Sequence, residues 1–292
     1  MRAANKNSIT IKALVNVPVQ KAWLAYTNAV AVMQWNFASD DWYCPTAEND
    51  LRVGGKMKSR MEAKDGSFGF DFEAIYDEVI DQKKLAYGLA DGRKVVITFE
   101  SDGDKTKVIT TFDAESENSL EMQEAGWQAI INNYKAYAER AVRMETLYFE
   151  TEIKAPVSKV ASIMLGEDTY KEWTAEFNPT SRYKGSWQKG SKILFIGTDK
   201  DGNEEGMVSR IKEHLPNKFV SIEHLGMVHK GEEITSGKVV EGWAGALENY
   251  SFAETKTGTK LWVTLDSNVE YKNYFSEAWP RALKKLKQIC EA

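Results

Sequence analysis

The sequence is poor in the side chains that build disulfide frameworks and metal centres. Its 292 residues include two cysteines, Cys44 and Cys290, which are too few for a disulfide framework or a four-thiolate site. A zinc site needs three or four converging ligands, and the three histidines supply at most a pair on neighbouring strands, His214 and His224. The sequence also lacks a P-loop and a dinucleotide-binding glycine fingerprint. We therefore expect no metal and no cofactor.

Long apolar runs and an excess of basic charge are missing as well. No apolar run approaches the roughly 18 residues of a membrane-spanning helix, and residues 1–12 lack the apolar core of a secretion signal. The formal net charge is −5, whereas a nucleic-acid binder presents a basic surface to phosphates. These absences favour a cytoplasmic protein that binds no nucleic acid and does not insert into a membrane.

Aromatic residues are abundant, and the sequence repeats itself. Aromatics make up 11% of the chain and include nine Trp, enough to fill a large core or to line a cavity. A Pro-Val-x-Lys motif starts at Pro18 and again at Pro156, and a tryptophan follows each at the same distance. Matching offsets at several separated positions predict two homologous domains with almost no linker, 1–142 and 145–292.

The pattern within the first half predicts mixed α and β structure. Alternating apolar residues predict a strand over 8–17, and Pro18 fits the first turn of a helix. Short runs rich in β-branched and aromatic residues, separated by Asp-Gly turns, predict an antiparallel meander. From Ser119 the apolar period changes to 3.6, which predicts a long helix that ends at about residue 143. The expected short helices lie at about 18–26 and 29–35, and the expected strands at about 46–51, 56–63, 68–79, 84–89, 93–101 and 106–114.

The second half repeats the long helix but places a proline in it. Pro280 falls within the predicted C-terminal helix, beside Trp279. Because proline lacks an N–H donor and clashes with the preceding turn, we expect it either to start the helix or to kink it.

Three stretches of the first half resemble a known family. They are LRVGGK at 51–56, FEAIYDEV at 72–79, and the Gly126-Trp127 pair of the closing helix. In these stretches the chain is similar to bacterial relatives of the C-terminal domain of the heat-shock-protein-90 ATPase activator, in the START-like (SRPBCC) superfamily of helix-grip folds. The second half resembles them more loosely and carries an insertion near 230–246. The resemblance implies an α+β protein of two tandem domains, each a curved antiparallel sheet wrapped around a long C-terminal helix, with two short helices after the first strand.

The resemblance also implies a cavity between sheet and helix that holds a small hydrophobic or amphipathic molecule of lipid, polyketide or aromatic type. Met57 and Met61 share one strand face, as do Phe70 and Phe72, and these faces either line an adaptable pocket or fill a core. The aromatic segment 35–45 is expected to be a loop, either at the cavity mouth or capping the core. The candidate ligand-binding residues are Trp35, Trp42, Tyr43, Met57, Met61, Phe70, Phe72, Trp127, Trp173, Phe177, His224, Trp243 and Trp279.

Two other functions remain open for the same sequence. An enzyme of cyclase or hydrolase type would use Asp40, Asp41, Glu223 or His224 as acid or base, although no residue is assigned a catalytic role. Contact with a chaperone is implied by the family resemblance alone. Because the chain has much apolar lining material and few groups able to transfer protons, binding without transformation is the leading hypothesis.

Overall fold

The computed structural model describes residues 7–141 and 144–292. The chain divides into two compact units, 1–142 and 143–292, which we call unit one and unit two. The expected helix end near residue 143 and the expected domain boundary at residue 142 lie outside the described residues. In the part of the chain that is described, no helix is both long and apolar enough to cross a membrane.

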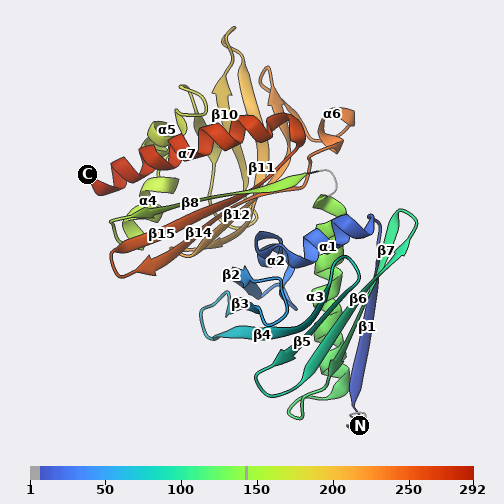
Figure 1. Ribbon diagram of the computed structural model, residues 1–292. Coiled ribbons are helices and arrows are strands. Elements are labelled where there is room, and N and C mark those ends of the chain that lie inside the picture. The colour runs from blue at the N-terminus through green and yellow to red at the C-terminus, as the bar shows by residue number, and fades with distance from the viewer. Residues whose placement is uncertain (1–6, 142–143) are drawn as a thin grey trace. The chain divides into compact units, whose positions relative to one another are not determined.

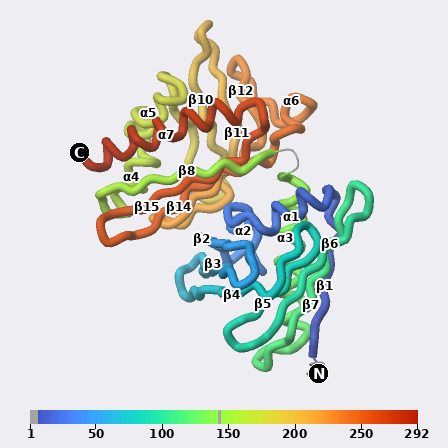
Figure 2. The backbone as a smooth tube through the Cα atoms, in the orientation of Figure 1, coloured from blue at the N-terminus to red at the C-terminus, as the bar shows by residue number. Residues whose placement is uncertain are grey.

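Within residues 7–141, unit one forms a seven-stranded antiparallel sheet with two short helices and one long helix (Figure 1). The strand order is β1-β7-β6-β5-β4-β3-β2, so the first strand pairs with the last, as the backbone trace in Figure 2 also shows. The long helix α3 packs beside β1. The elements are β1 (Ser8–Val15), α1 (Val19–Thr27), α2 (Ala29–Trp35), β2 (Trp42–Asn49), β3 (Lys56–Ala63), β4 (Gly69–Ile80), β5 (Lys84–Leu89), β6 (Lys94–Asp102), β7 (Lys105–Asp113) and α3 (Leu120–Ala141).

Local sequence explains several of these boundaries. Exposed and buried side chains alternate along β1, because every second side chain of a strand points to the same face. Asn28 separates the two short helices, and its side chain accepts a hydrogen bond from the Ala31 amide at 3.1 Å, which caps α2. Gly92 has a φ of 89° in the turn between β5 and β6, a conformation that glycine adopts without strain.

Strand β2 begins earlier than the sequence predicts. The expected loop through Pro45 is wrong, because β2 already starts at Trp42. The pairing of β2 with β3 shifts register between Tyr43 and Thr46, and Pro45 lies in this bulge. Proline has no N–H for a ladder, so it is tolerated at a bulge in an edge strand, although it interrupts the alternation by which a strand is recognised in sequence.

Unit two repeats this arrangement with an eight-stranded antiparallel sheet. Its order is β8-β15-β14-β12-β11-β10-β9, and the long helix α7 packs beside β8. The insertion near 230–246 forms β13, which pairs with the end of β12, and the short helix α6. The elements are β8 (Glu145–Ile153), α4 (Val157–Leu165), α5 (Glu167–Thr174), β9 (Arg182–Gly185), β10 (Lys192–Thr198), β11 (Glu204–Leu215), β12 (Phe219–His229), β13 (Glu232–Ile234), α6 (Lys238–Glu241), β14 (Ala246–Thr255), β15 (Gly258–Ser267) and α7 (Val269–Glu291).

Helix α7 starts well before Pro280. The Asn268 side chain accepts a hydrogen bond from the Tyr271 amide at 3.1 Å, and this cap begins the helix at Val269. Pro280 therefore lies inside α7, where it removes one donor from the helical ladder. The helix continues through this position because Trp279 and its neighbours are buried in the core of unit two.

Aromatic side chains fasten each long helix to its sheet. In unit one Trp127 of α3 stacks on Phe112 of β7, with ring centroids 4.3 Å apart. In unit two Trp279 of α7 stacks on Phe149 of β8 at 5.9 Å. Each unit thus packs an antiparallel sheet against a long C-terminal helix, and the predicted α+β arrangement of two helix-grip units is confirmed.

Candidate functional site

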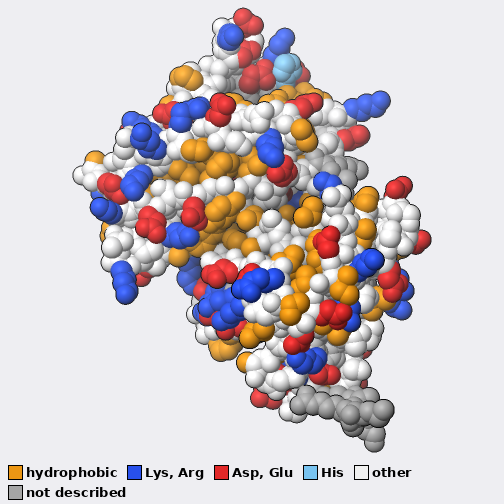
Figure 3. Space-filling model, viewed as in Figure 1, with side chains coloured by type: hydrophobic (Ala, Val, Ile, Leu, Met, Phe, Trp, Pro, Cys, Tyr) orange, Lys and Arg blue, Asp and Glu red, His pale blue; other side chains and the backbone are white. Residues whose placement is uncertain are grey.

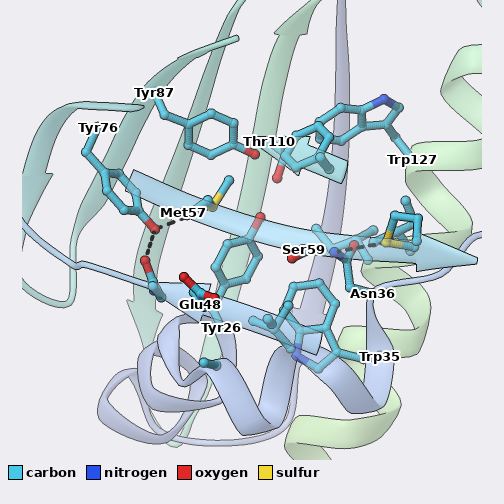
Figure 4. Close-up of a pocket in the computed structure, with 18 of the residues that line it drawn as sticks. Tyr26, Trp35, Asn36, Glu48, Met57, Ser59, Tyr76, Tyr87, Thr110 and Trp127 are labelled. Atoms are coloured by element: carbon cyan, nitrogen blue, oxygen red, sulfur yellow. Dashed lines mark hydrogen bonds between the residues drawn. The ribbon is translucent and has the colours of Figure 1, made fainter. Parts of the chain in front are cut away.

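Unit one contains a cavity between its sheet and its helices, with a volume of about 140 Å³. Strands β2, β3 and β4 supply one wall, and α2 and α3 supply residues such as Trp35, Trp127 and Ile131 (Figure 4). Most of the lining is apolar, aromatic or thioether in character. Such a lining favours an apolar ligand, because binding removes the apolar surfaces of both the ligand and the cavity wall from water.

The register of β3 and β4 explains why their apolar side chains meet in this cavity. Ser59 lies opposite Phe72 and Met61 lies opposite Phe70, and all four line the cavity. Met57, two residues before Ser59, lies on the same face.

The alternate side chains of the same strands point to the outer face. Lys58 pairs with Asp71 at 2.7 Å and Arg60 with the same carboxylate at 3.4 Å. In Figure 3 basic side chains gather next to acidic ones over this part of unit one. The period of two therefore separates an apolar inner face from an ion-paired outer face.

Three tyrosines bring hydroxyl groups to the cavity. The Tyr76 hydroxyl donates to Asn49 Oδ1 at 2.9 Å and lies 3.6 Å from Met57 Sδ. Burial raises the pKa of Tyr76 to about 12, and it raises the pKa values of Tyr26 and Tyr87 well above the ordinary phenol value. All three phenols are therefore neutral hydrogen-bonding groups at neutral pH.

Charge is nearly excluded from the cavity wall. Among the described residues that line it, Glu48 carries the only formal charge, and none is Lys, Arg or His. Glu48 is exposed on β2, so its carboxylate lies at the solvent-facing part of the wall.

An aromatic cluster stands beside the cavity. Trp42 lies 5.8 Å from Phe70 and 6.1 Å from Phe68, measured between ring centroids. Phe70 both lines the cavity and is 42% exposed, so the cavity reaches the surface beside this cluster.

The structure brings together part of the residue set predicted for unit one. Trp42 lies in the neighbouring aromatic cluster and does not line the cavity. Tyr43 also lies off the cavity wall, and its hydroxyl donates to Glu62 on β3 at 2.9 Å. The predicted residues that line the cavity are Trp35, Met57, Met61, Phe70, Phe72 and Trp127. Residues on the wall that the sequence did not single out include Tyr26, Asn49, Tyr76, Tyr87 and Thr110.

The predicted aromatic residues of unit two pack mainly against one another. The Trp279 ring lies 5.1 Å from Phe177 and 5.9 Å from Trp173. Trp173 is 1% exposed and its indole N–H donates to the Met164 carbonyl at 3.0 Å. Trp243 lies just after α6, where its indole N–H donates to the Val239 carbonyl at 3.0 Å. Trp173, Phe177 and Trp279 therefore belong to the packed core of unit two, and Trp243 belongs to the insertion.

His224 of unit two belongs to a buried hydrogen-bonded chain. Its Nδ1 lies 2.9 Å from Ser209 Oγ, and its Nε2 lies 3.4 Å from Glu248 Oε2. The Tyr250 hydroxyl donates to the other oxygen of Glu248. Ser209 is completely buried, so a substrate cannot reach its hydroxyl in this structure.

The other candidate acids and bases lie at the surface. Asp40 and Asp41 are exposed, and Glu223 pairs with Arg210 on the neighbouring strand. Within the described residues, no group of three or more His, Cys, Asp and Glu side chains could hold a metal ion. His224 is thus the one predicted acid or base that lies in an interior.

Comparison with known proteins concerns mainly unit one. Residues 16–139 match the family model described as activator of Hsp90 ATPase homolog 1-like protein. A solution structure of such a protein from Aeromonas hydrophila is 38% identical over 46% of this chain and 94% of its own, with a TM-score of 0.44. A protein from Cytophaga hutchinsonii is 41% identical over 47% of this chain and 94% of its own, with a TM-score of 0.42.

Solved structures of two-domain proteins also match across both units. The di-domain ARO/CYC protein BexL from the BE-7585A biosynthetic pathway is 12% identical over 98% of this chain and 99% of its own, with a TM-score of 0.46. Among curated proteins, none matches the sequence.

Proposed function

Since the chain belongs to the family of activator of Hsp90 ATPase homolog 1-like proteins, we propose that unit one binds a small hydrophobic molecule between its sheet and α3 without transforming it. The observation that carries this proposal is the cavity itself, about 140 Å³ in volume and walled mainly by apolar side chains. An apolar protein cavity of about 150 Å³ holds a benzene molecule. The ligand that fits this conformation is therefore of single-ring size.

The chemistry of the cavity wall favours binding over catalysis. A general acid or base works best when its pKa lies near the working pH. Burial instead raises the pKa of Tyr76 to about 12, and it raises those of Tyr26 and Tyr87 as well. Cys44 is a neighbour of the wall residue Ser59, but burial raises the pKa of its thiol to about 12, so it is a poor nucleophile at neutral pH.

Chaperone contact receives less support from the surface of unit one. On the outer face of β3 and β4, Lys56 pairs with Glu73 at 2.7 Å and Lys58 pairs with Asp71 at the same distance. Charges that are paired within one sheet offer little surplus attraction to a partner. We therefore propose ligand binding as the function of this unit.

A pair of substitutions on β2 tests the proposal. Ala47 lines the cavity opposite Ser59, whereas the adjacent Thr46 is exposed and lies off the wall. Ala47→Phe should fill the cavity and abolish binding of ethylbenzene, and Thr46→Phe should leave it unchanged. Binding is measured by calorimetric titration, and the circular dichroism of each variant reports whether it is folded. Equal binding of ethylbenzene by the wild type and a folded Ala47→Phe variant would contradict the proposal.

A further inference from the structure

The hydroxyl of Tyr87, a largely buried residue on the cavity wall, has no protein partner among the described residues. Tyr87 is 3% exposed and lines the cavity from β5. Among residues 7–141 and 144–292, none forms a hydrogen bond with its hydroxyl. Because its oxygen can be reached from the cavity and is not enclosed by protein atoms, a ligand there can form a hydrogen bond with it. A hydroxyl that the fold leaves unpaired inside a binding cavity is available to a ligand.

A second hydroxyl lies on the same side of the cavity. Figure 4 shows Tyr87 extending from the sheet toward Thr110, with the Tyr26 hydroxyl turned into the same space. Hydrogen bonding by the Thr110 side chain partly offsets the burial that raises the pKa of Tyr26, and either hydroxyl of this pair can act as the donor. In the arrangement in which Thr110 donates, the Tyr26 proton is available to a ligand. Tyr76, by contrast, already donates its proton to Asn49.

The surroundings of these hydroxyls specify the charge of the group they bind. A carboxylate would be buried without a basic partner, because no Lys, Arg or His is found among the described residues of the wall. A carbonyl oxygen is neutral and has two lone pairs, which match two donors.

We propose that the cavity selects a neutral, single-ring carbonyl compound, such as an aryl ketone, whose oxygen accepts hydrogen bonds from Tyr87 and Tyr26. This inference rests on the proposed function and adds to it the polarity of the ligand. The apolar part of the ligand then lies among Met57, Phe72 and Trp127, and the carbonyl points to the phenols. Fatty acids and other carboxylates are rejected.

Three probes of similar size test the selection: acetophenone, ethylbenzene and benzoate. Acetophenone should bind the wild-type protein about three- to tenfold more tightly than ethylbenzene, the range that one net hydrogen bond confers. Benzoate, which is ionised at pH 7.5, should bind more weakly than either. Calorimetric titration of the full-length protein gives the three dissociation constants.

Two single-oxygen deletions show whether the effect belongs to Tyr87. Tyr87→Phe should reduce the preference for acetophenone over ethylbenzene, because one of the two proposed donors is removed. Tyr134→Phe is the matched control, because Tyr134 is buried in the same unit, donates its hydroxyl to the Ala22 carbonyl at 2.8 Å and does not line the cavity. This control should retain the preference.

The outcomes separate the two proposals. If acetophenone and ethylbenzene bind equally, or if Tyr87→Phe keeps the full preference, the carbonyl inference is wrong while the binding function stands. If no probe binds the wild-type protein, the binding function fails and the inference fails with it. Tight benzoate binding would overturn the assignment of a neutral ligand.

Discussion

Deleting one oxygen atom from either of two buried tyrosines in unit one is expected to affect its stability differently. Tyr134 is fully buried, and its hydroxyl donates to the Ala22 carbonyl at 2.8 Å, which ties α3 to α1. Tyr87 is 3% exposed, and its hydroxyl has no partner among the described residues. Tyr134→Phe therefore removes a protein hydrogen bond, whereas Tyr87→Phe removes none.

The magnitude follows from the net value of one hydrogen bond. Tyr134→Phe should lower the free energy of unfolding of unit one by about 1 kcal/mol. With a urea dependence of about 2 kcal/mol per M, that loss moves the midpoint by about 0.5 M. Tyr87→Phe should change the free energy by less than about 0.5 kcal/mol, or raise it, because an unpaired hydroxyl leaves the interior.

Native-state hydrogen exchange provides an assay for unit one alone. Ile97 lies in β6 within the sheet of unit one and is completely buried, so its amide should exchange mainly when the unit opens. The opening free energy at Ile97 is compared in the wild type and the two variants, both without added ligand. Equal losses of about 1 kcal/mol in both variants would refute the distinction between a paired and an unpaired hydroxyl.

Three further outcomes are expected. Trp279→Ala should destabilise unit two by about 3–5 kcal/mol in a denaturant titration, because Trp279 is 2% exposed and packs against four other aromatic rings. A loss of less than about 1 kcal/mol would contradict the placement of Trp279 in the core. Cys44 and Cys290 should not react with a thiol reagent at pH 8 until urea unfolds the chain, since burial raises their pKa values to about 12 and about 11. Rapid labelling of the native protein would contradict this prediction, because it would show that the thiols are accessible. Burial also raises the pKa values of Tyr170 and Tyr250. Their neutral forms therefore stabilise the fold fully below the unfolded pKa of about 10, and this stabilisation is lost as the pH rises above that value. Phenolate absorbance should appear together with unfolding, and gradual ionisation of a folded protein would contradict this prediction.

More of the fold than of the site could be predicted from the sequence. The strands follow from local periodicity, whereas the site depends on contacts between strands that are distant in sequence. Alternation with a period of two correctly placed Met57 and Met61 on one face, since the period follows from strand geometry alone. Tyr87 was missed because its neighbours Leu85 and Val95 are ordinary core residues, and only the register with β4 and β6 shows which tyrosine meets the cavity. Whether the hydroxyl finds a partner depends on contacts between strands that are distant in sequence.

The residue type also does not tell a side chain that lines a cavity from one that fills a core. Trp127 and Trp279 both lie on the long C-terminal helix of their unit, yet Trp127 lines a cavity while Trp279 packs against Trp173 and Phe177. The difference comes from the residues opposite each ring. These are Phe112 in one unit and a cluster of aromatic residues from α5 and its C-terminal flank in the other, which a single sequence does not pair.

The bulge at Pro45 has a consequence for how copies of this protein behave when they meet. The outermost strand of a sheet can recruit a strand from a neighbouring molecule, which is how fibrils grow. In unit one that strand is β2, where Pro45 offers no donor and the ladder is broken, and in unit two it is β9, which is four residues long. The opposite borders, β1 and β8, each have a long helix packed beside them. Both sheets therefore resist edge-to-edge association with other copies, even though each contains a long series of paired strands.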